Sequence, residues 1–415
     1  MTRAVTIAAG RTIRFLAAVA LGCGMTASGA PAAAGPDWPL WRGPNRDGIS
    51  AETQWNPAAL AGTPVFVWKI NVGNGHSAVA IKGERLYTLG NKSGKDYVYC
   101  LEVQTGKEIW HYAYDCVAGD YPGPRCTPVV DGERVYSMSR AGQVLCLNAK
   151  DGALIWQKNV VTELKATPPQ WGFAGSACVY GKTVLFNAGE HGVMFNKENG
   201  AVVWASASGI GGYATPVIYT NGARLTGLIF ASKALAGVDL RTGKEAWSFA
   251  WEVGYDVNAA DPIVAGDTVF ISSGYNKGGA LLELTAGAPK VCWENKNMCN
   301  HFSTGVLIGG HLYGVSGNTG GALLSCVNFT TGAAMWTQKG GFESISAAGG
   351  KLLAMNVQGQ LVIAEASPTA YKELARANVL PVGGEIKCWT MPVLCRGLVF
   401  CRNSVGDLVC VDLRK

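Results

Sequence analysis

Charge is scarce in this chain, and so are long apolar runs. Only 15% of the 415 residues are charged, and the formal net charge is +6. No basic stripe stands out, which argues against a nucleic-acid partner. The apolar run from Phe15 to Met25 is too short to span a bilayer. No other stretch is a candidate, so we expect no transmembrane segment.

Familiar catalytic motifs are also missing. The chain has no Gly-x-Ser-x-Gly elbow, no phosphate-binding loop and no Cys-x-x-Cys-His haem site. No group of Asp, Asn and Glu has the spacing of a Ca²⁺ loop. The histidines form no close metal-binding pair: they are His76, His111, His191, His301 and His311. The sequence therefore predicts no metal site.

The N-terminus has the features of an export signal. Arg3, Arg11 and Arg14 precede the apolar run, and Ala32-Ala33-Ala34 suits a signal peptidase. We expect cleavage of residues 1–34, which removes three arginines and no acid and lowers the net charge from +6 to +3. The mature chain would be periplasmic or secreted. Ala20-Leu21-Gly22-Cys23 loosely resembles a lipoprotein cleavage box, so a lipid anchor at Cys23 is the less favoured alternative.

A short phrase, Gly followed four residues later by Trp, recurs along the chain. The copies are Gly106–Trp110, Gly152–Trp156, Gly200–Trp204, Gly243–Trp247 and Gly332–Trp336, with a stretched copy from Gly287 to Trp293. Their glycines are 43 to 48 residues apart, a period typical of propellers and solenoids. Between the phrases, apolar runs meet at a Gly turn, as in Val129–Gly132–Tyr136. Counting these hairpins gives eight repeats of about four strands each, which predicts an all-β, eight-bladed β-propeller of four-stranded antiparallel blades.

The two ends of the chain complete one blade. The last repeat stops after its third strand at residues 409–413, and residues 65–70 form a spare strand that carries Trp68. We expect this strand to close the eighth blade and the ring. Residues 35–64 form a Trp/Pro/Gly-rich segment packed on the propeller of residues 65–415. The tryptophans predicted to pack between blades are Trp68, Trp110, Trp156, Trp204, Trp247, Trp293 and Trp336.

Most of the 13 cysteines fit the repeat rather than a disulfide framework. Cys100, Cys146, Cys326 and Cys410 occupy one repeat position, where other copies have Met, Gly, Leu or Ile. That position is predicted to be a buried packing site. The best candidate disulfide is Cys116–Cys126, on either side of the Gly119–Pro124 loop.

Two segments carry a resemblance to a known family. Residues 239–247, Asp-Leu-Arg-Thr-Gly-Lys-Glu-Ala-Trp, resemble the tryptophan-docking motif of pyrroloquinoline quinone (PQQ)-type propellers. Residues 38–48, Trp-Pro-Leu-Trp-Arg-Gly-Pro-Asn-Arg-Asp-Gly, resemble the N-terminal signature of exported bacterial PQQ-like propeller repeat proteins. The resemblance covers residues 37–415 and implies a BamB-like, eight-bladed ring. It leaves function open, because one propeller fold serves both enzymes and scaffolds.

The quinoprotein dehydrogenases of this superfamily hold PQQ over Ca²⁺ beside a disulfide between adjacent cysteines. This chain has no adjacent cysteines and lacks the expected set of metal ligands. A ligand site, if present, should lie where the chain enters the inner strand of each blade near the central channel. The candidates there are His76, Arg125, Trp171, Tyr213, Asn258, His301, Glu343 and Lys387. The competing interpretation is that these residues only plug the channel and hold loops.

These observations favour a non-catalytic periplasmic propeller that binds or scaffolds a protein partner in the cell envelope. We expect a monomer without a cofactor and with no catalytic residue. One alternative is a PQQ-dependent oxidoreductase, which would need PQQ with Ca²⁺. Another is a propeller that binds a polysaccharide or small ligand, with Trp171 and Tyr213 as stacking platforms.

Overall fold

The computed structural model describes residues 36–206, 209–221, 224–285 and 287–414. The expected signal peptide and Cys23 lie outside these residues. Strands make up nearly all regular structure in the described part, and the helices are two short 3₁₀ turns, η1 (Pro57–Leu60) and η2 (Gly254–Asp256). In the part of the chain that is described, no helix combines the length and hydropathy required to cross a bilayer.

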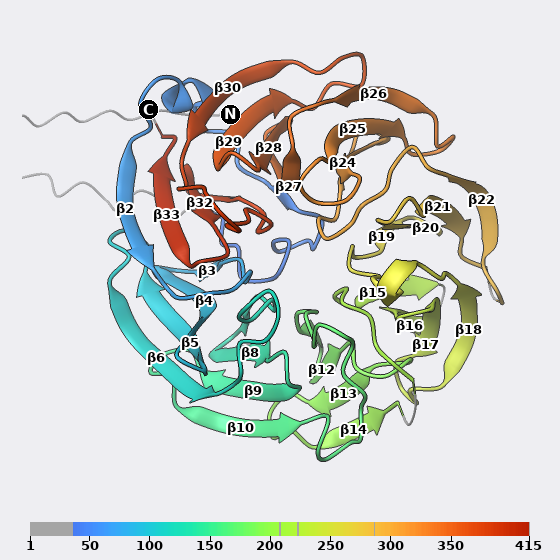
Figure 1. The fold of residues 1–415 in the computed structure, drawn as a ribbon. Coiled ribbons are helices and arrows are strands. Elements are labelled where there is room, and N and C mark those ends of the chain that lie inside the picture. The colour runs from blue at the N-terminus through green and yellow to red at the C-terminus, as the bar shows by residue number, and fades with distance from the viewer. Residues whose placement is uncertain (1–35, 207–208, 222–223, 286, 415) are drawn as a thin grey trace, which may run out of the picture. The chain divides into compact units, whose positions relative to one another are not determined.

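Eight sheets follow one another around a ring (Figure 1). Blade 1 consists of β3 (Ala80–Lys82), β4 (Arg85–Lys92), β5 (Lys95–Glu102) and β6 (Glu108–Asp115). Blade 2 consists of β7 (Val129–Asp131), β8 (Arg134–Met138), β9 (Gln143–Asn148) and β10 (Leu154–Asn159). Blade 3 consists of β11 (Cys178–Tyr180), β12 (Thr183–Phe186), β13 (Val193–Asn196) and β14 (Val202–Ala205). Blade 4 consists of β15 (Val217–Asn221), β16 (Arg224–Phe230), β17 (Ala234–Asp239) and β18 (Glu245–Ala250).

The second half of the ring repeats this plan. Blade 5 consists of β19 (Ile263–Ala265), β20 (Thr268–Ser273), β21 (Gly278–Glu283) and β22 (Lys290–Asn295). Blade 6 consists of β23 (Val306–Ile308), β24 (His311–Ser316), β25 (Leu323–Asn328) and β26 (Ala334–Gln338). Blade 7 consists of β27 (Phe342–Ala348), β28 (Lys351–Asn356), β29 (Gln360–Glu365) and β30 (Glu373–Asn378). Blade 8 consists of β31 (Val393–Cys395), β32 (Leu398–Arg402), β33 (Asp407–Asp412) and the early strand β2 (Phe66–Asn71).

The predicted closure of the ring is confirmed. Strand β2 pairs antiparallel with β33, with Trp68 opposite Cys410, and supplies the outer strand of blade 8. Figure 1 shows the blue β2 beside the red β33. Because blade 8 combines strands from both ends of the chain, separating the ends would open the ring and expose strand edges.

The hydrophobic core is divided among the junctions between neighbouring blades. Eight clusters of buried residues occur, and each joins residues of two adjacent blades. The third strands are buried over runs of three to five residues, with four in β9 and β33, since both of their faces are covered by other blades. Outer strands are more exposed, as in β6, where Trp110 and Tyr114 are the buried residues, because one face meets solvent.

The Gly/Trp phrase links each of blades 1 to 6 to the next blade. The Trp110 indole N–H donates to the Ala149 carbonyl of blade 2 at 3.2 Å, and the ring lies against Gly152. A Cβ at Gly152 would sit 2.5 Å from the Trp110 ring, and the glycine has φ +75°. Indole N–H groups make the same type of bond from Trp68, Trp156, Trp204, Trp293 and Trp336.

The repeat position of the four cysteines faces the tryptophans. Cys100 pairs with Trp110 across blade 1, and Cys146 pairs with Trp156 across blade 2. All four of these cysteines are fully buried, as the packing interpretation predicted. Trp247 pairs instead with Gly237, where an added Cβ would collide with the indole ring. The residue at this position therefore varies with the space that the tryptophan leaves.

The N-terminal segment from residue 36 to residue 64 runs across several blades. Trp38 forms a backbone bridge with Ile81 of blade 1. The buried Arg42 guanidinium donates to the Thr304 carbonyl next to blade 6 at 3.0 Å. Strand β1 (Ile49–Ser50) then pairs in parallel with β27 of blade 7. The segment thus contacts blades that are distant in sequence and ties them together.

Candidate functional site

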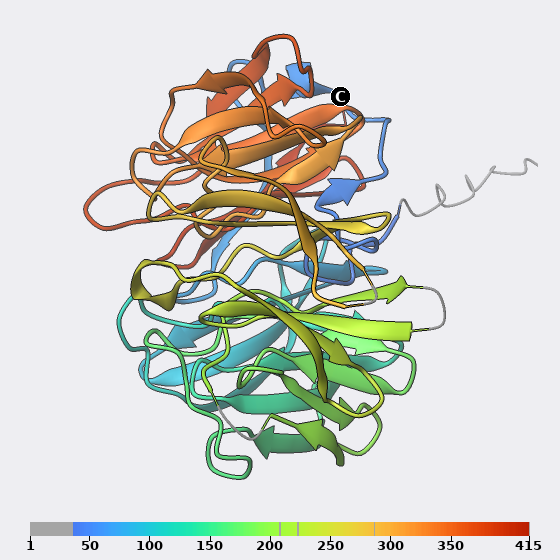
Figure 2. The same cartoon turned by 90° about the vertical axis from the view of Figure 1, so that its right-hand side faces the viewer.

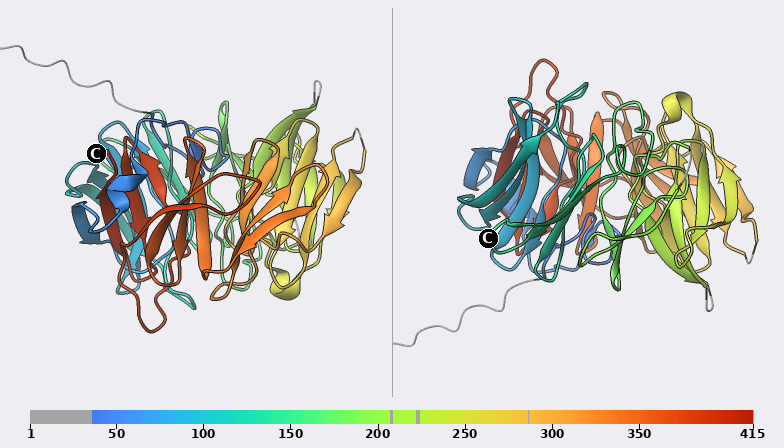
Figure 3. Two further views of the ribbon diagram at one scale, coloured as in Figure 1. Left: turned by 90° about the horizontal axis from the view of Figure 1, so that it is seen from above. Right: turned by 90° about the horizontal axis from the view of Figure 1, so that it is seen from below.

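The predicted site residues belong to the stretches that lead into the inner strands. His76, Arg125, Trp171, Tyr213, Asn258, His301 and Lys387 lie in these loops, and Glu343 is the second residue of β27. We call this side of the ring the channel face. Because neighbouring strands are antiparallel, the turns between second and third strands lie on the same face. Figures 2 and 3 show η2 and the loop between β30 and β31 projecting on this side.

Asn258 serves the architecture of the ring. It is fully buried, and its side-chain N–H₂ group donates to the carbonyls of Ala231, Ser232 and Trp251 at 2.9 to 3.2 Å. Its side-chain oxygen accepts from the Ser273 hydroxyl at 2.7 Å. With both ends of the amide occupied, Asn258 holds loops in place and has no group left for a ligand.

Arg125 is likewise occupied by backbone groups. Its guanidinium donates to the Trp171 carbonyl at 2.6 Å and to the Asp120 and Tyr121 carbonyls at 3.1 and 3.2 Å. Burial, followed by the nearby Arg140, lowers the Arg125 pKa to about 10. These donors hold the loops that lead into blades 2 and 3, so they are not free to bind an anionic ligand.

Tyr213 contacts Trp171 through a hydrogen bond and through its ring. Its hydroxyl accepts from the Trp171 backbone N–H at 3.3 Å, and the ring centroids are 6.2 Å apart. Tyr213 is only 8% exposed, so it offers little ring surface to a ligand. Trp171 is half-buried and remains the more accessible of the two predicted platforms.

Glu343 of β27 and Lys387 both contact the loop that leads into β31 of blade 8. The Glu343 carboxylate accepts from the Cys388 N–H at 2.9 Å, and burial raises its pKa. The Lys387 backbone N–H donates to the Ser404 hydroxyl at 3.0 Å. Both residues thus help to fix the loop before β31.

His76 and His301 are held by aromatic rings. His76 stacks on Trp389 at 4.9 Å, and burial lowers its pKa to about 3, helped by Arg125. His301 stacks on Phe302 at 3.6 Å and is 6% exposed. Burial lowers the His301 pKa to about 4, and neither of its ring nitrogens has a hydrogen-bond partner. Both imidazoles are therefore neutral at pH 7.

The structure joins some of these residues to aromatics that the sequence did not single out. We name the resulting group the aromatic collar: Tyr121, Trp171, Tyr255, Tyr275, His301, Phe302 and Trp389. Ring contacts run from Tyr121 through Trp389, Phe302, His301, Tyr275 and Tyr255 to Trp171, with centroids 3.6 to 6.1 Å apart. Arg125 connects the two ends of this series, because it donates to the carbonyls of both Trp171 and Tyr121.

Three tyrosines of the collar have a left-handed backbone. Their φ angles are +48° at Tyr121, +59° at Tyr255 and +51° at Tyr275. Bulky residues rarely adopt this conformation, which costs about 1–3 kcal/mol per residue and is concentrated at functional sites. The loops must therefore hold these three rings in place against local strain.

No ready-made acidic site for the Ca²⁺ that accompanies PQQ occurs among the described residues of the channel face. Calcium needs about six to eight oxygen ligands, and no cluster of three His, Cys, Asp or Glu suited to a metal occurs among the described residues. A flat quinone also needs two parallel walls with space between them. Here the two nearly parallel pairs, His76–Trp389 and His301–Phe302, are already stacked on each other.

The predicted Cys116–Cys126 disulfide is not formed in this structure. Both cysteines are free and buried. The Cys126 thiol donates to the Thr127 carbonyl at 3.4 Å. Burial raises the pKa of Cys116 to about 12 and that of Cys126 to about 11. Burial therefore keeps both thiols protonated in the folded protein.

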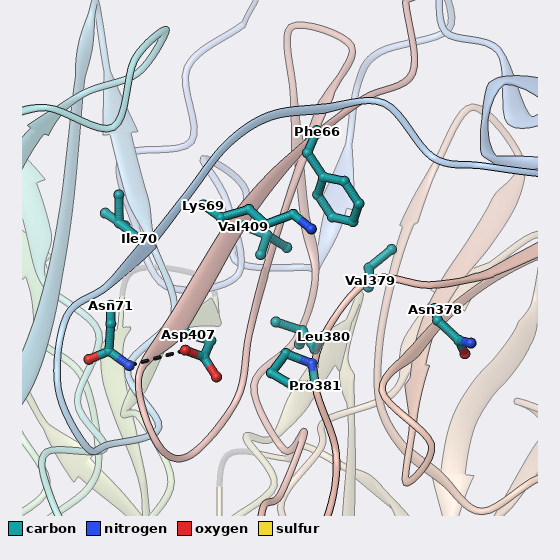
Figure 4. A pocket seen from close by; sticks show the side chains of 10 residues that line it. All are labelled: Phe66, Lys69, Ile70, Asn71, Asn378, Val379, Leu380, Pro381, Asp407 and Val409. Carbon is teal, nitrogen blue, oxygen red and sulfur yellow. Dashed lines mark hydrogen bonds between the residues drawn. The ribbon is translucent and has the colours of Figure 1, made fainter.

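A second feature lies on the outer wall, at the junction of blades 7 and 8. Ala375 of β30 pairs with Ile363 at the register where other blades carry tryptophan. Trp55 and Leu60 of the N-terminal segment pack into the cluster at this junction. A cleft of about 630 Å³ remains between the outer strands β2 and β30 (Figure 4). We call it the blade 7–8 cleft.

The cleft has an apolar lining and polar groups at its edge. Its residues are Phe66, Lys69, Ile70, Asn71, Asn378, Val379, Leu380, Pro381, Asp407 and Val409. Lys69 extends over the Phe66 ring, with Nζ 3.4 Å from the centroid, and Asn71 donates to Asp407 at 3.1 Å. Among the described residues, no carboxylate forms an ion pair with Lys69.

Solved structures share this architecture at low sequence identity. BamB from Moraxella catarrhalis is 17% identical with a TM-score of 0.61, covering 85% of this chain and 98% of its own. Quinohemoprotein alcohol dehydrogenase from Comamonas testosteroni is 12% identical with a TM-score of 0.69, covering 91% and 81%. A europium-containing methanol dehydrogenase is 12% identical with a TM-score of 0.68, covering 90% of each chain. These similarities establish the fold alone.

The sequence itself identifies the family. No curated protein matches the chain. Residues 95–338, more than half of the chain, match the family described as outer membrane protein assembly factor BamB. The matched part runs from β5 of blade 1 to the end of β26 in blade 6 and includes five copies of the unstretched Gly/Trp phrase. The chain therefore belongs to the family of outer membrane protein assembly factor BamB and folds as a PQQ-like β-propeller.

Proposed function

We propose that this chain is a non-catalytic propeller of the bacterial cell envelope that holds a protein partner. The observation that carries the proposal is that three polar side chains of the channel face bind groups of the protein itself. Asn258 and Arg125 bind loop carbonyls, and Glu343 binds a loop N–H. A catalytic site would need such groups free to meet a substrate.

The blade 7–8 cleft supplies a surface for the partner. Its apolar lining suits a buried anchor side chain, the kind of contact that dominates protein interfaces. Lys69 at its edge favours an acidic residue next to that anchor. Strand β2 is also the outermost strand of its sheet, so an extended segment can add to its free edge. The proposed partner is a protein with an extended segment that carries an apolar residue beside an acidic one.

The proposed location follows from the export signal and the family. Protein from residue 35 onward would act in the periplasm as a monomer that binds a larger assembly. BamB is named as an outer membrane protein assembly factor, and a role of this chain in envelope protein assembly is part of the proposal.

The test is affinity capture from native envelope extracts with three baits. Wild-type protein should retain one partner reproducibly, and Lys69→Glu should reduce its recovery at least tenfold. The matched control is Lys244→Glu, the same exchange at an exposed position in the turn between β17 and β18 of blade 4, which should retain the partner. Equal recovery by all three baits would refute the cleft as the docking surface, and recovery of nothing would refute the scaffold proposal.

The oxidoreductase alternative makes an opposite prediction. Titration of the purified protein with PQQ and Ca²⁺ should leave the quinone absorption spectrum unchanged, because the described residues hold no group of three His, Cys, Asp or Glu suited to a metal. Dye reduction with alcohols or sugars should also stay at the level of a protein-free control. A bound-quinone spectrum with dye reduction would contradict the non-catalytic proposal.

A further inference from the structure

We propose that the aromatic collar binds a β-linked pyranose oligosaccharide at the channel face. This site is distinct from the blade 7–8 cleft, and the proposal does not depend on a protein partner. Pyranose rings have apolar C–H faces and hydroxyl edges, so they pack on aromatic rings while forming hydrogen bonds at their sides. The collar provides both kinds of contact.

The exposed rings of the collar provide the stacking surface. Tyr121 is 50% exposed and Tyr255 is 65% exposed, although large aromatic rings are usually buried. They reach the collar from different loops, one between blades 1 and 2 and the other in η2. Both have a left-handed backbone, with φ +48° and +59°. Strain that keeps exposed rings in fixed positions is typical of ligand clamps.

The tilt of the rings favours a sugar chain over a flat molecule. Tyr121 and Trp389 meet at 43°, and Tyr255 meets Trp171 at 57°. The ring faces therefore follow a curve rather than forming parallel walls. Successive sugars of a β-1,4-linked chain present their apolar faces on alternating sides, which suits aromatic rings that approach from several loops.

The polar groups in the collar and next to it suit a neutral ligand. Both nitrogens of His301, and Nε2 of His76, which stacks on Trp389 of the collar, are buried and have no hydrogen-bond partner. A neutral imidazole can donate from one nitrogen and accept at the other, as a hydroxyl partner requires. The Arg125 guanidinium donates instead to three carbonyls, so it is not available as a fork for an anion.

The experiment is isothermal titration calorimetry with two probes, tetra-N-acetylchitotetraose and cellotetraose. Wild-type protein should bind at least one of them. Tyr255→Ala and Tyr121→Ala should each weaken that binding at least tenfold, whereas Tyr255→Trp should preserve it. Both tyrosines are exposed, so circular dichroism should show that the variants fold.

The matched control is Tyr180→Ala on β11. Tyr180 is 48% exposed and lies outside the collar, so this variant should bind like the wild type. Lys69→Glu should also bind normally, which separates this site from the cleft. No binding of either probe by the wild type, or equal binding by the Tyr255→Ala and Tyr180→Ala variants, would overturn the proposal.

Discussion

At the scale of single residues, most of the polar side chains proposed for a ligand site have a structural role: they are buried and hold loops in place. Asn258 and Glu343 were candidates for a ligand site, and both hold loops. The sequence could place them on one face, because the repeat fixes where each inner strand begins. It could not reveal their partners, such as the Ser273 hydroxyl that donates to Asn258, because these contacts join loops from different parts of the chain.

His301 makes the fold sensitive to acid. Burial lowers its pKa from 6.5 to about 4, so between these values the unfolded chain binds a proton that the folded protein does not. Stability should therefore fall as the pH drops from 6.5 towards 4, by about 2 kcal/mol at pH 5 from this histidine. Urea unfolding at pH 7 and pH 5 measures the loss, and His301→Gln should reduce it. An unchanged pH response in this variant would contradict the assignment.

At the scale of elements, the Gly/Trp phrase connects neighbouring blades. Its period allowed the number and strand order of the blades to be predicted. The phrase recurs because the glycine adopts a positive φ and the tryptophan packs against the glycine turn of the next blade. The blade 7–8 cleft could have been inferred only from the loss of the phrase in blade 7. Nothing in the repeat predicted that Trp55 and Leu60 would pack into that junction.

Two glycine substitutions separate backbone strain from the contact with tryptophan. Gly152 has φ +75° and lies against Trp110, whereas Gly132 has φ +59° and nothing within 4 Å of an added Cβ. Alanine strains the backbone at either position, but only at Gly152 does it also collide with the indole ring. Gly152→Ala should therefore destabilise the protein by about 1–3 kcal/mol more than Gly132→Ala. Equal unfolding midpoints in denaturant would refute this role of the phrase.

At the scale of the whole molecule, the ring depends on the pairing of β2 with β33. A protein that begins at residue 73 would lack Trp68 and its bond to the Val103 carbonyl, and would expose the edge of β33. We expect it to associate or precipitate, while protein beginning at residue 36 stays monomeric in size-exclusion chromatography. A stable monomer of the shorter protein would show that closure is dispensable.

The candidate sites were less predictable than the ring. The aromatic collar includes Tyr255, Tyr275, Phe302 and Trp389, which lie in loops of unequal length and share no repeat register. Their contacts arise only when the closed ring brings those loops to one face. Sequence periodicity specifies the blades well because every blade repeats one pattern, whereas each loop on the channel face occurs once.

The central claim, that this propeller binds a protein through the blade 7–8 cleft, is tested most directly by crosslinking in living cells. A photo-crosslinking amino acid in place of Phe66 lies in the cleft, and the same group in place of Val203 lies on the exposed wall of blade 3. The account predicts one discrete protein adduct from position 66, lost on Lys69→Glu and absent at position 203. No adduct at position 66, or the same adducts from both positions, would contradict it.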